Sequence, residues 1–231
     1  MSARQLALDL GHRPALGRED FLLAPGNADA VAWLDRWPDW PAPALSIYGP
    51  EGSGKTHLAQ VWRARSGASL LAAAALSEAA LPALAAQPVV IEDADRGVDE
   101  RALLHLYNLL AERRLHLLLT GRSAPARWPL ALADLRSRLN AAPAAALAPP
   151  DESLVGAVLV KLLADRQLRV GDEVVAFLLA RLERSFAAAQ RIVEALDRAA
   201  LAQRSNITVP LARQVLQDQA ADSAAVHREE N

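Results

Sequence analysis

The sequence Gly49-Pro50-Glu51-Gly52-Ser53-Gly54-Lys55-Thr56 matches the pattern G-x-x-x-x-G-K-[ST] at every fixed position. An apolar run at residues 45–48 precedes it and predicts a buried strand, and residues 57–65 after it predict a helix. In this strand–loop–helix context the pattern forms a phosphate-binding P-loop. Its glycines let successive backbone N–H groups turn toward a phosphate chain, and the following helix adds the positive end of its dipole.

Two side chains of the loop have specific expected roles. Lys55 would reach the β- and γ-phosphates, and the Thr56 hydroxyl would bind Mg²⁺. Lys55 and Lys161 are the only lysines in a chain that otherwise uses arginine, which argues against a chance match. We expect ADP or ATP, with Mg²⁺, to bind at Gly49, Pro50, Glu51, Gly52, Ser53, Gly54, Lys55, Thr56 and His57.

Composition sets limits on the class of protein. The 231 residues have room for one α/β domain and a small second domain, and 52% of them are apolar. A net charge of −2 gives no reason to expect sequence-specific DNA binding by the surface as a whole. The absence of cysteine excludes disulfides and cysteine-based metal sites. Neither a signal peptide nor a membrane span is visible, so a cytoplasmic location is expected.

The order of the expected elements predicts an α/β fold. Apolar strands are expected at residues 69–73, 89–93, 115–119 and 144–147, and helices alternate with them. Such alternation is typical of a parallel sheet covered by helices on both faces, which gives three layers. A helix capped by Asn27 is expected to run to about Trp37, with Trp33 and Trp37 as packing residues.

Beyond Pro149-Pro150 the pattern becomes wholly helical. Each of the four helices expected there follows or begins with a polar residue that can cap it, and residues 221–231 are expected to be disordered. The expected helices span residues 151–169, 172–184, 185–203 and 208–219.

Four further residues could carry chemistry at a bound phosphate, in this chain or in a neighbouring subunit. Val89-Val90-Ile91-Glu92-Asp93 ends an apolar strand with two carboxylates, of which Glu92 would hold Mg²⁺ and Asp93 would orient water and also contact the metal. A solvated acidic turn is the alternative. Thr120, at the end of the next expected strand, could bond the γ-phosphate or simply end the strand. Arg138 could act as an arginine finger on a neighbouring subunit or be an ordinary surface arginine.

The motifs GPEGSGKTHL, VVIEDAD, HLLLTGR and DLRSRL, followed by a helical block, resemble the AAA+ module of the DnaA family of replication initiators. The resemblance extends over roughly residues 18–220. The family's terminal DNA-binding domain and its N-terminal helicase-interaction domain are not expected here. An AAA+ module with only a short N-terminal peptide is the layout of the Hda-like members. It implies a nucleotide-binding AAA+ core at 18–150 and a small all-helical lid at 151–220.

The resemblance also assigns a role to the first seventeen residues. Taken alone, the segment Gln5-Leu6-Ala7-Leu8-Asp9-Leu10 fits three interpretations, which are a disordered tail, a stray edge strand and a partner-binding peptide. Hda-like members begin with a sliding-clamp-binding motif, which Gln5, Leu6, Leu8 and Leu10 match, with Asp9 where proline is common. Residues 1–17 are therefore expected to bind the DNA polymerase III β sliding clamp.

The implied partner of the module is DnaA. Arg138 would contact ATP bound to DnaA, and hydrolysis of that ATP would prevent a second initiation. A finger that acts in trans also implies contact between subunits, including self-association of this chain. The family's sensor 2 arginine has no counterpart in Ser185-Phe186-Ala187-Ala188-Ala189, although Arg184 and Arg191 flank this stretch. Weak or no ATPase activity of the chain itself is expected. The alternatives are an autonomous AAA+ ATPase that loads a helicase, and a P-loop kinase, which would need an acceptor-binding lid inserted within the sheet.

Overall fold

The structure, a computed structural model, describes residues 24–203 and 206–229 of the chain. In this part, five parallel strands form one sheet in the order β2-β3-β4-β1-β5. The strands lie in the segments expected from the sequence, which confirms the parallel α/β architecture. They are β1 Ala44–Tyr48, β2 Ser69–Ala72, β3 Val89–Glu92, β4 Leu117–Gly121 and β5 Ala144–Ala146.

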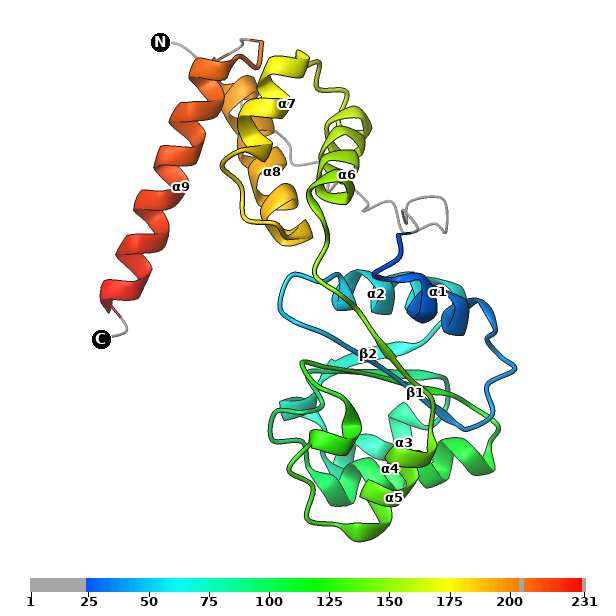
Figure 1. Cartoon of the computed structure of the whole chain (residues 1–231). Coiled ribbons are helices and arrows are strands. Elements are labelled where there is room, and N and C mark those ends of the chain that lie inside the picture. The colour runs from blue at the N-terminus through cyan, green and yellow to red at the C-terminus, as the bar shows by residue number, and fades with distance from the viewer. Residues whose placement is uncertain (1–23, 204–205, 230–231) are drawn as a thin grey trace, which may run out of the picture.

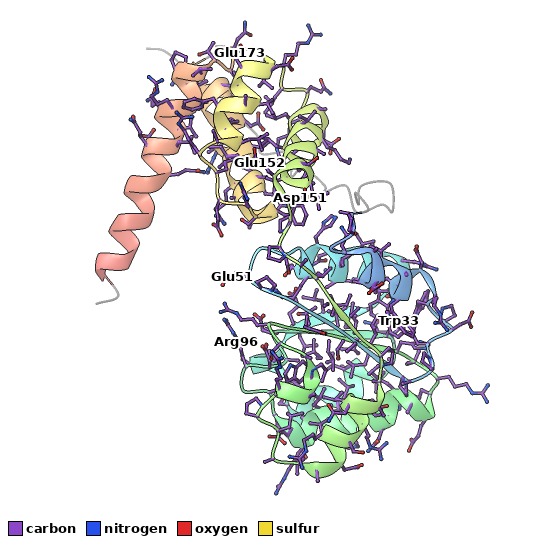
Figure 2. All side chains as sticks on the ribbon, viewed as in Figure 1. Trp33, Glu51, Arg96, Asp151, Glu152 and Glu173 are labelled. Carbon is purple, nitrogen blue, oxygen red and sulfur yellow. The ribbon has the colours of Figure 1, made fainter. Side chains whose placement is uncertain are left out.

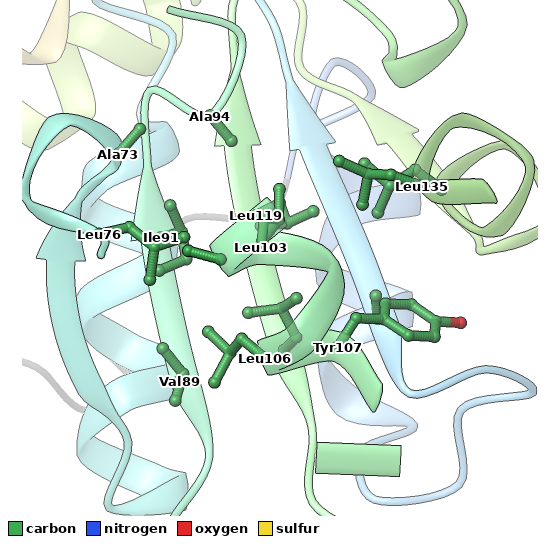
Figure 3. Packing of buried hydrophobic residues seen from close by; sticks show 14 of the residues in the cluster. Ala73, Leu76, Val89, Ile91, Ala94, Leu103, Leu106, Tyr107, Leu119 and Leu135 are labelled. Carbon is green, nitrogen blue, oxygen red and sulfur yellow. The ribbon is translucent and has the colours of Figure 1, made fainter. Parts of the chain in front are cut away.

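Helices cover both faces of the sheet (Figure 1). The apolar side chains of β3 alternate between two cores, because successive residues of a strand point to opposite faces. Val89 and Ile91 join the core beneath α4 and α5, whereas Val90 joins the core beneath α1 and α2. Figure 3 shows the first of these cores, in which Leu103, Leu106 and other side chains of α4 pack on the strands. The helices are α1 Ala28–Asp35, α2 Lys55–Ser66, α3 Leu81–Leu84, α4 Glu100–Glu112 and α5 Ala133–Ala141, with short 3-10 turns at Ala73–Ala75, Glu78–Ala80 and Pro125–Arg127.

A cluster of tryptophans closes the edge of the sheet at which β1 and β4 begin. The rings of Trp40 and Trp62 stack with centroids 5.4 Å apart, and His116 lies edge-on to Trp40 at 5.2 Å. Trp37 contacts Trp62 edge-on at 6.1 Å, as expected of a packing residue. The helix expected to run to about Trp37 is present as α1 and ends at Asp35. Asn27 precedes α1 but its side chain does not cap it.

The second region is a block of four helices with its own apolar core. It consists of α6 Glu152–Asp165, α7 Asp172–Leu179, α8 Phe186–Gln203 and α9 Val209–Glu229, which pack around Leu159, Leu178, Ile192, Leu211 and their neighbours. Asp151 caps α6 as expected, since its Oδ1 accepts a hydrogen bond from Leu154 N at 2.7 Å. Asp172 lies in the first turn of α7, after the capping position at Gly171.

The last helix corrects the expected disorder for residues 221–229, the part of the expected 221–231 tail that the structure describes. The backbone of α9 is helical to Glu229, about ten residues past the expected end. Residues 220–229 hold four alanines and neither glycine nor proline, and alanine has the highest helix propensity. Within the described ranges, no helix combines the length and the apolar character needed to cross a membrane.

Candidate functional site

The P-loop lies at the edge where the parallel strands β1, β3 and β4 end. Tyr48 pairs with Gly121, and the next residue, Gly49, donates its N–H to Gly121 O at 3.1 Å. Gly52 and Gly54 have φ angles of +75° and +96°, a conformation that glycine adopts without the steric cost of a side chain. A Cβ at Gly49 would lie 2.3 Å from Leu147 O, so this position has no room for a side chain. Glycine is therefore required at these positions of the motif, at Gly52 and Gly54 by the backbone angles and at Gly49 by the lack of space for a side chain.

Lys55 begins α2 and turns back toward the loop. Its Nζ donates hydrogen bonds to Gly49 O and Pro50 O, both at 2.7 Å. Burial lowers the pKa of this amine, the nearby carboxylate of Asp93 partly opposes the shift, and the guanidinium of Arg122 adds to it. Thr56, the next residue of α2, has an exposed side chain at the same helix end. The ammonium group is therefore held among the loop carbonyls, where a phosphate chain would meet it.

The end of β3 is tied to the end of β4 next to Lys55. Thr120 is 2% exposed, and its Oγ1 accepts a hydrogen bond from Asp93 N at 3.2 Å, while its carbonyl accepts one from Ala94 N at 2.8 Å. Asp93 adopts φ +54°, which turns the chain sharply after the strand. The structure therefore brings together Lys55, Asp93 and Thr120, three of the residues singled out in the sequence.

Glu92 has an oxygen suited to a cation. Its Oε1 is buried and has no hydrogen-bond partner among the described residues. An unsatisfied carboxylate oxygen inside a protein is costly, and a magnesium ion or one of its water ligands would satisfy it. Glu92 thus fits the expected metal position, with Thr56 and Asp93 as the other expected contacts. Within the described ranges, no three His, Asp or Glu side chains form a metal site without the nucleotide.

Sequence reasoning missed Asp95 and Arg122 as members of this site. Asp95 Oδ2 accepts a hydrogen bond from Arg122 N at 2.8 Å, and Arg122 Nη2 lies 2.6 Å from Glu51 Oε2. The carboxylate of Asp95 also raises the pKa of Lys55, although less than Asp93 does. Asp95 follows the expected acidic pair by two residues and Arg122 follows Thr120 by two, so their nearness to the motifs was the available signal.

The helical block contacts the P-loop through the start of α8. A Cβ at Gly52 would lie 2.5 Å from Ser185 Cβ, and one at Gly54 would lie 3.0 Å from the ring of Phe186. Phe186 N also donates to Gly52 O at 3.4 Å. Figure 2 shows Glu51 at the edge of the core that faces this block, below Asp151 and Glu152. The small size of Gly52 and Gly54 therefore allows the helical block to pack directly on the loop.

The two arginines that flank the expected sensor 2 position form ion pairs with carboxylates of the helical block. Arg184 Nη2 lies 3.0 Å from Glu152 Oε2, and Arg191 Nη2 lies 3.9 Å from Glu183 Oε2. The residues of this stretch that meet the P-loop are Ser185 and Phe186, which carry no charge.

Arg138 lies apart from the P-loop of its own chain. It belongs to α5, which packs with α4 at the end of the core away from the helical block (Figure 1). Its Nε donates to Asp134 Oδ1 at 3.0 Å, its guanidinium lies 5.6 Å from the ring centroid of Tyr107, and its side chain is 39% exposed. This placement leaves the guanidinium accessible to another molecule. The expected clamp-binding residues Gln5, Leu6, Leu8 and Leu10 lie outside the described residues.

Comparisons with known proteins agree with this architecture. Residues 155–216 match the family model described as Hda, lid domain. Domain III of the replication initiation protein DnaA from Thermotoga maritima has a TM-score of 0.73 at 19% identity, covering 89% of this chain and 97% of that one. AMPPCP-bound DnaA from Aquifex aeolicus has a TM-score of 0.62 at 18% identity, covering 76% of this chain and 63% of that one. An uncharacterised protein of Haemophilus influenzae is 28% identical over 192 residues, covering 77% of this chain and 83% of that protein.

The parallel sheet, the P-loop at its edge and the helical block seated on that loop form an AAA+ fold, an α/β core followed by a helical lid. Residues 155–216 thus resemble the lid domain of Hda, and the described chain has the fold of DnaA domain III.

Proposed function

We propose that this protein binds an adenine nucleotide with Mg²⁺ and promotes hydrolysis of the ATP bound to DnaA, and so limits replication initiation. The observation that carries the proposal is the separation of the P-loop from Arg138 within the chain. The P-loop lies beneath the lid, whereas Arg138 is exposed on α5 at the other end of the core. An arginine so placed can serve a nucleotide bound to a partner.

Nucleotide binding follows from the chemistry of the P-loop. Backbone N–H groups, the start of α2 and the Lys55 ammonium would hold the phosphates, and Thr56 and Glu92 would hold the magnesium ion. The chain's own hydrolysis is expected to be weak, because Ser185 and Phe186 stand where the lid meets the loop and bring no positive charge. The nucleotide would then join core and lid as a structural ligand.

Arg138 would act on the γ-phosphate of ATP in DnaA. When water attacks that phosphorus, the bond to the β-phosphate oxygen breaks, and negative charge spreads over the transferring oxygens and the leaving group. A guanidinium placed there stabilises this charge more than it stabilises bound ATP. Arginine fingers accelerate such reactions by about 10³–10⁵-fold, so a single residue is sufficient to switch DnaA to its ADP form.

The N-terminal segment would bring the protein to replicating DNA. Leu6, Leu8 and Leu10 would fill an apolar groove on the sliding clamp, and Gln5 would hydrogen-bond at its rim. Recruitment by a DNA-loaded clamp would couple the inactivation of DnaA to the start of synthesis.

The test is hydrolysis of ATP prebound to DnaA, with clamp loaded on DNA. The wild-type chain is compared with Arg138→Ala, with the double change of Gln5 and Leu6 to alanine, and with Arg136→Ala. Arg136 is an exposed arginine of the same helix and serves as the matched control. We expect stimulation by the wild type and by Arg136→Ala, and near-background hydrolysis with the other two.

Each other outcome contradicts a defined part of the proposal. No stimulation by the wild type refutes the regulatory function and favours the autonomous ATPase that loads a helicase. Loss of stimulation with Arg136→Ala, but not with Arg138→Ala, refutes the choice of finger. Full stimulation by the Gln5 and Leu6 variant refutes the role of the N-terminal segment.

A further inference from the structure

The guanidinium of Arg138 is held within its own chain at one edge and one face. Its Nε donates a hydrogen bond to Asp134 Oδ1 at 3.0 Å, and the two residues lie about one helical turn apart on α5. The guanidinium carbon lies 5.6 Å from the ring centroid of Tyr107, within the range of a cation–π contact. Tyr107 belongs to α4 and is only 6% exposed, so the ring that faces Arg138 is fixed in the core.

These contacts leave the other edge of the guanidinium available to a ligand. In the part of the chain that the structure describes, the side-chain hydrogen bond of Arg138 comes from Nε and not from Nη1 or Nη2. The two Nη groups carry all but one of the N–H donors of a guanidinium, and a phosphate accepts two parallel bonds from such a fork. The side chain of Arg138 is 39% exposed, so a molecule outside the chain can reach this edge.

Asp134 contributes little to the stability of the fold. Its side chain is 58% exposed, and ion pairs so open to water change stability only slightly. Its place in the first turn of α5 adds a weak interaction of its charge with the helix dipole. An arginine side chain otherwise samples many rotamers, and ordering it when a partner binds lessens the benefit of the contact. A carboxylate that orders the guanidinium beforehand removes part of that cost.

We propose that Asp134 is a positioning residue for Arg138, which holds the Nε edge so that Nη1 and Nη2 face the terminal phosphate of a nucleotide bound to the partner. The inference rests on the proposed function, in which Arg138 acts on ATP in DnaA, and adds the group that orients it. The ring of Tyr107 supports one face of the same guanidinium. A guanidinium oriented before the complex forms meets the transition state without a further loss of side-chain entropy.

The experiment measures hydrolysis of ATP prebound to DnaA, with clamp loaded on DNA, over a range of concentrations of the full chain. Asp134→Ala should lower the maximal rate about threefold to tenfold and leave the half-saturating concentration within about twofold of the wild type. Asp134→Asn keeps an oxygen that can accept from Nε, so its maximal rate should stay within about twofold of the wild type. Glu112→Ala removes an exposed carboxylate of α4 and controls for the change of net charge, with wild-type values expected.

Two further measurements separate positioning from other roles. Asp134→Ala combined with Arg138→Ala should react no more slowly than Arg138→Ala alone, because Asp134 acts through Arg138. In NMR spectra of the full chain without DnaA, the Nε–H proton of Arg138 should exchange with water more slowly in the wild type and in Asp134→Asn than in Asp134→Ala. This second measurement reports the geometry whether or not DnaA responds.

Every other outcome overturns a defined claim. A faster maximal rate in Asp134→Ala would mean that Asp134 restrains the guanidinium, and equal losses in Asp134→Ala and Asp134→Asn would assign the effect to the charge at the start of α5. Either result overturns the inference, as does a further loss in the double variant or equal Nε–H exchange in all three chains. Equal acceleration by the wild type and by Asp134→Ala overturns the inference alone. If the wild type does not accelerate hydrolysis, the proposed function is wrong, and the inference fails with it.

Discussion

Substitution of Gly52 by alanine should destabilise the chain through two separate effects. The φ angle of +75° at Gly52 is one that an alanine adopts at a cost of about 1–2 kcal/mol. The added Cβ would also lie 2.5 Å from Ser185 Cβ, a distance too short for two carbon atoms. The start of α8 must then move, and overpacking of this kind costs about 1–3 kcal/mol. The expected total loss of unfolding free energy is about 2–5 kcal/mol.

Gly97→Ala provides the matched control. Gly97 has φ +67°, but a Cβ there meets nothing within 4 Å, so only the backbone effect applies. Urea unfolding should therefore show Gly52→Ala to be about 1–3 kcal/mol less stable than Gly97→Ala. In thermal unfolding the difference should be about 2–4 °C for each kcal/mol in a chain of this size. Equal losses in the two variants would refute the packing of the lid on the P-loop.

Three other substitutions or conditions test the rest of the structure. Burial lowers the pKa of His116 below its ordinary 6.5, so the contribution of this residue to folding stability should be constant well above pH 6.5 and fall as the pH drops below that value. His116→Gln should flatten this dependence in urea unfolding at pH 7.5 and 5.5, and an unchanged slope would contradict it. Asp151→Ala removes the cap of α6 and should cost about 0.5–2 kcal/mol by urea unfolding, whereas Asp151→Asn should cost less; equal effects would argue against capping. Trp62→Ala, at a position 1% exposed and stacked on Trp40, should cost about 3–5 kcal/mol by the same measurement, and a loss below 1 kcal/mol would contradict its burial.

The sequence was sufficient to predict the sheet and the P-loop because both depend on local patterns. The apolar runs of β1, β3 and β4 are buried on both faces, as continuous apolar strands of a parallel sheet are. The glycines of the loop are required by their own backbone angles and close contacts, which is why their spacing was informative.

Helix ends were predicted less well, for reasons visible at particular residues. Asn27 precedes α1, but its Oδ1 accepts a hydrogen bond from Ala24 N at 2.9 Å and the side chain does not cap the helix. The chain leaves α1 after Asp35, and Trp37 then packs with Trp62 and His116. Tertiary packing of aromatic rings thus overrode a helical pattern that would have continued to Trp37.

The composition of the site was only partly predictable, because several contacts join distant segments. Glu51 and Arg122 meet across seventy-one positions, and Ser185 meets Gly52 across more than one hundred. No local pattern encodes these contacts, and they arise from the parallel register of β1 with β4 and from the seating of the lid. The roles of Thr56, Glu92, Arg138 and the N-terminal segment remain predictions.

The most direct test of the nucleotide site is thermal unfolding of the full chain with Mg-ADP or Mg-ATP, in wild type and in Lys55→Ala. A ligand at one hundred times its dissociation constant stabilises the folded state by about 2.7 kcal/mol. We expect the midpoint temperature of unfolding to rise with nucleotide concentration in the wild type and to stay constant in Lys55→Ala. A wild-type midpoint that does not respond to either nucleotide, or an equal rise in Lys55→Ala, would contradict the account.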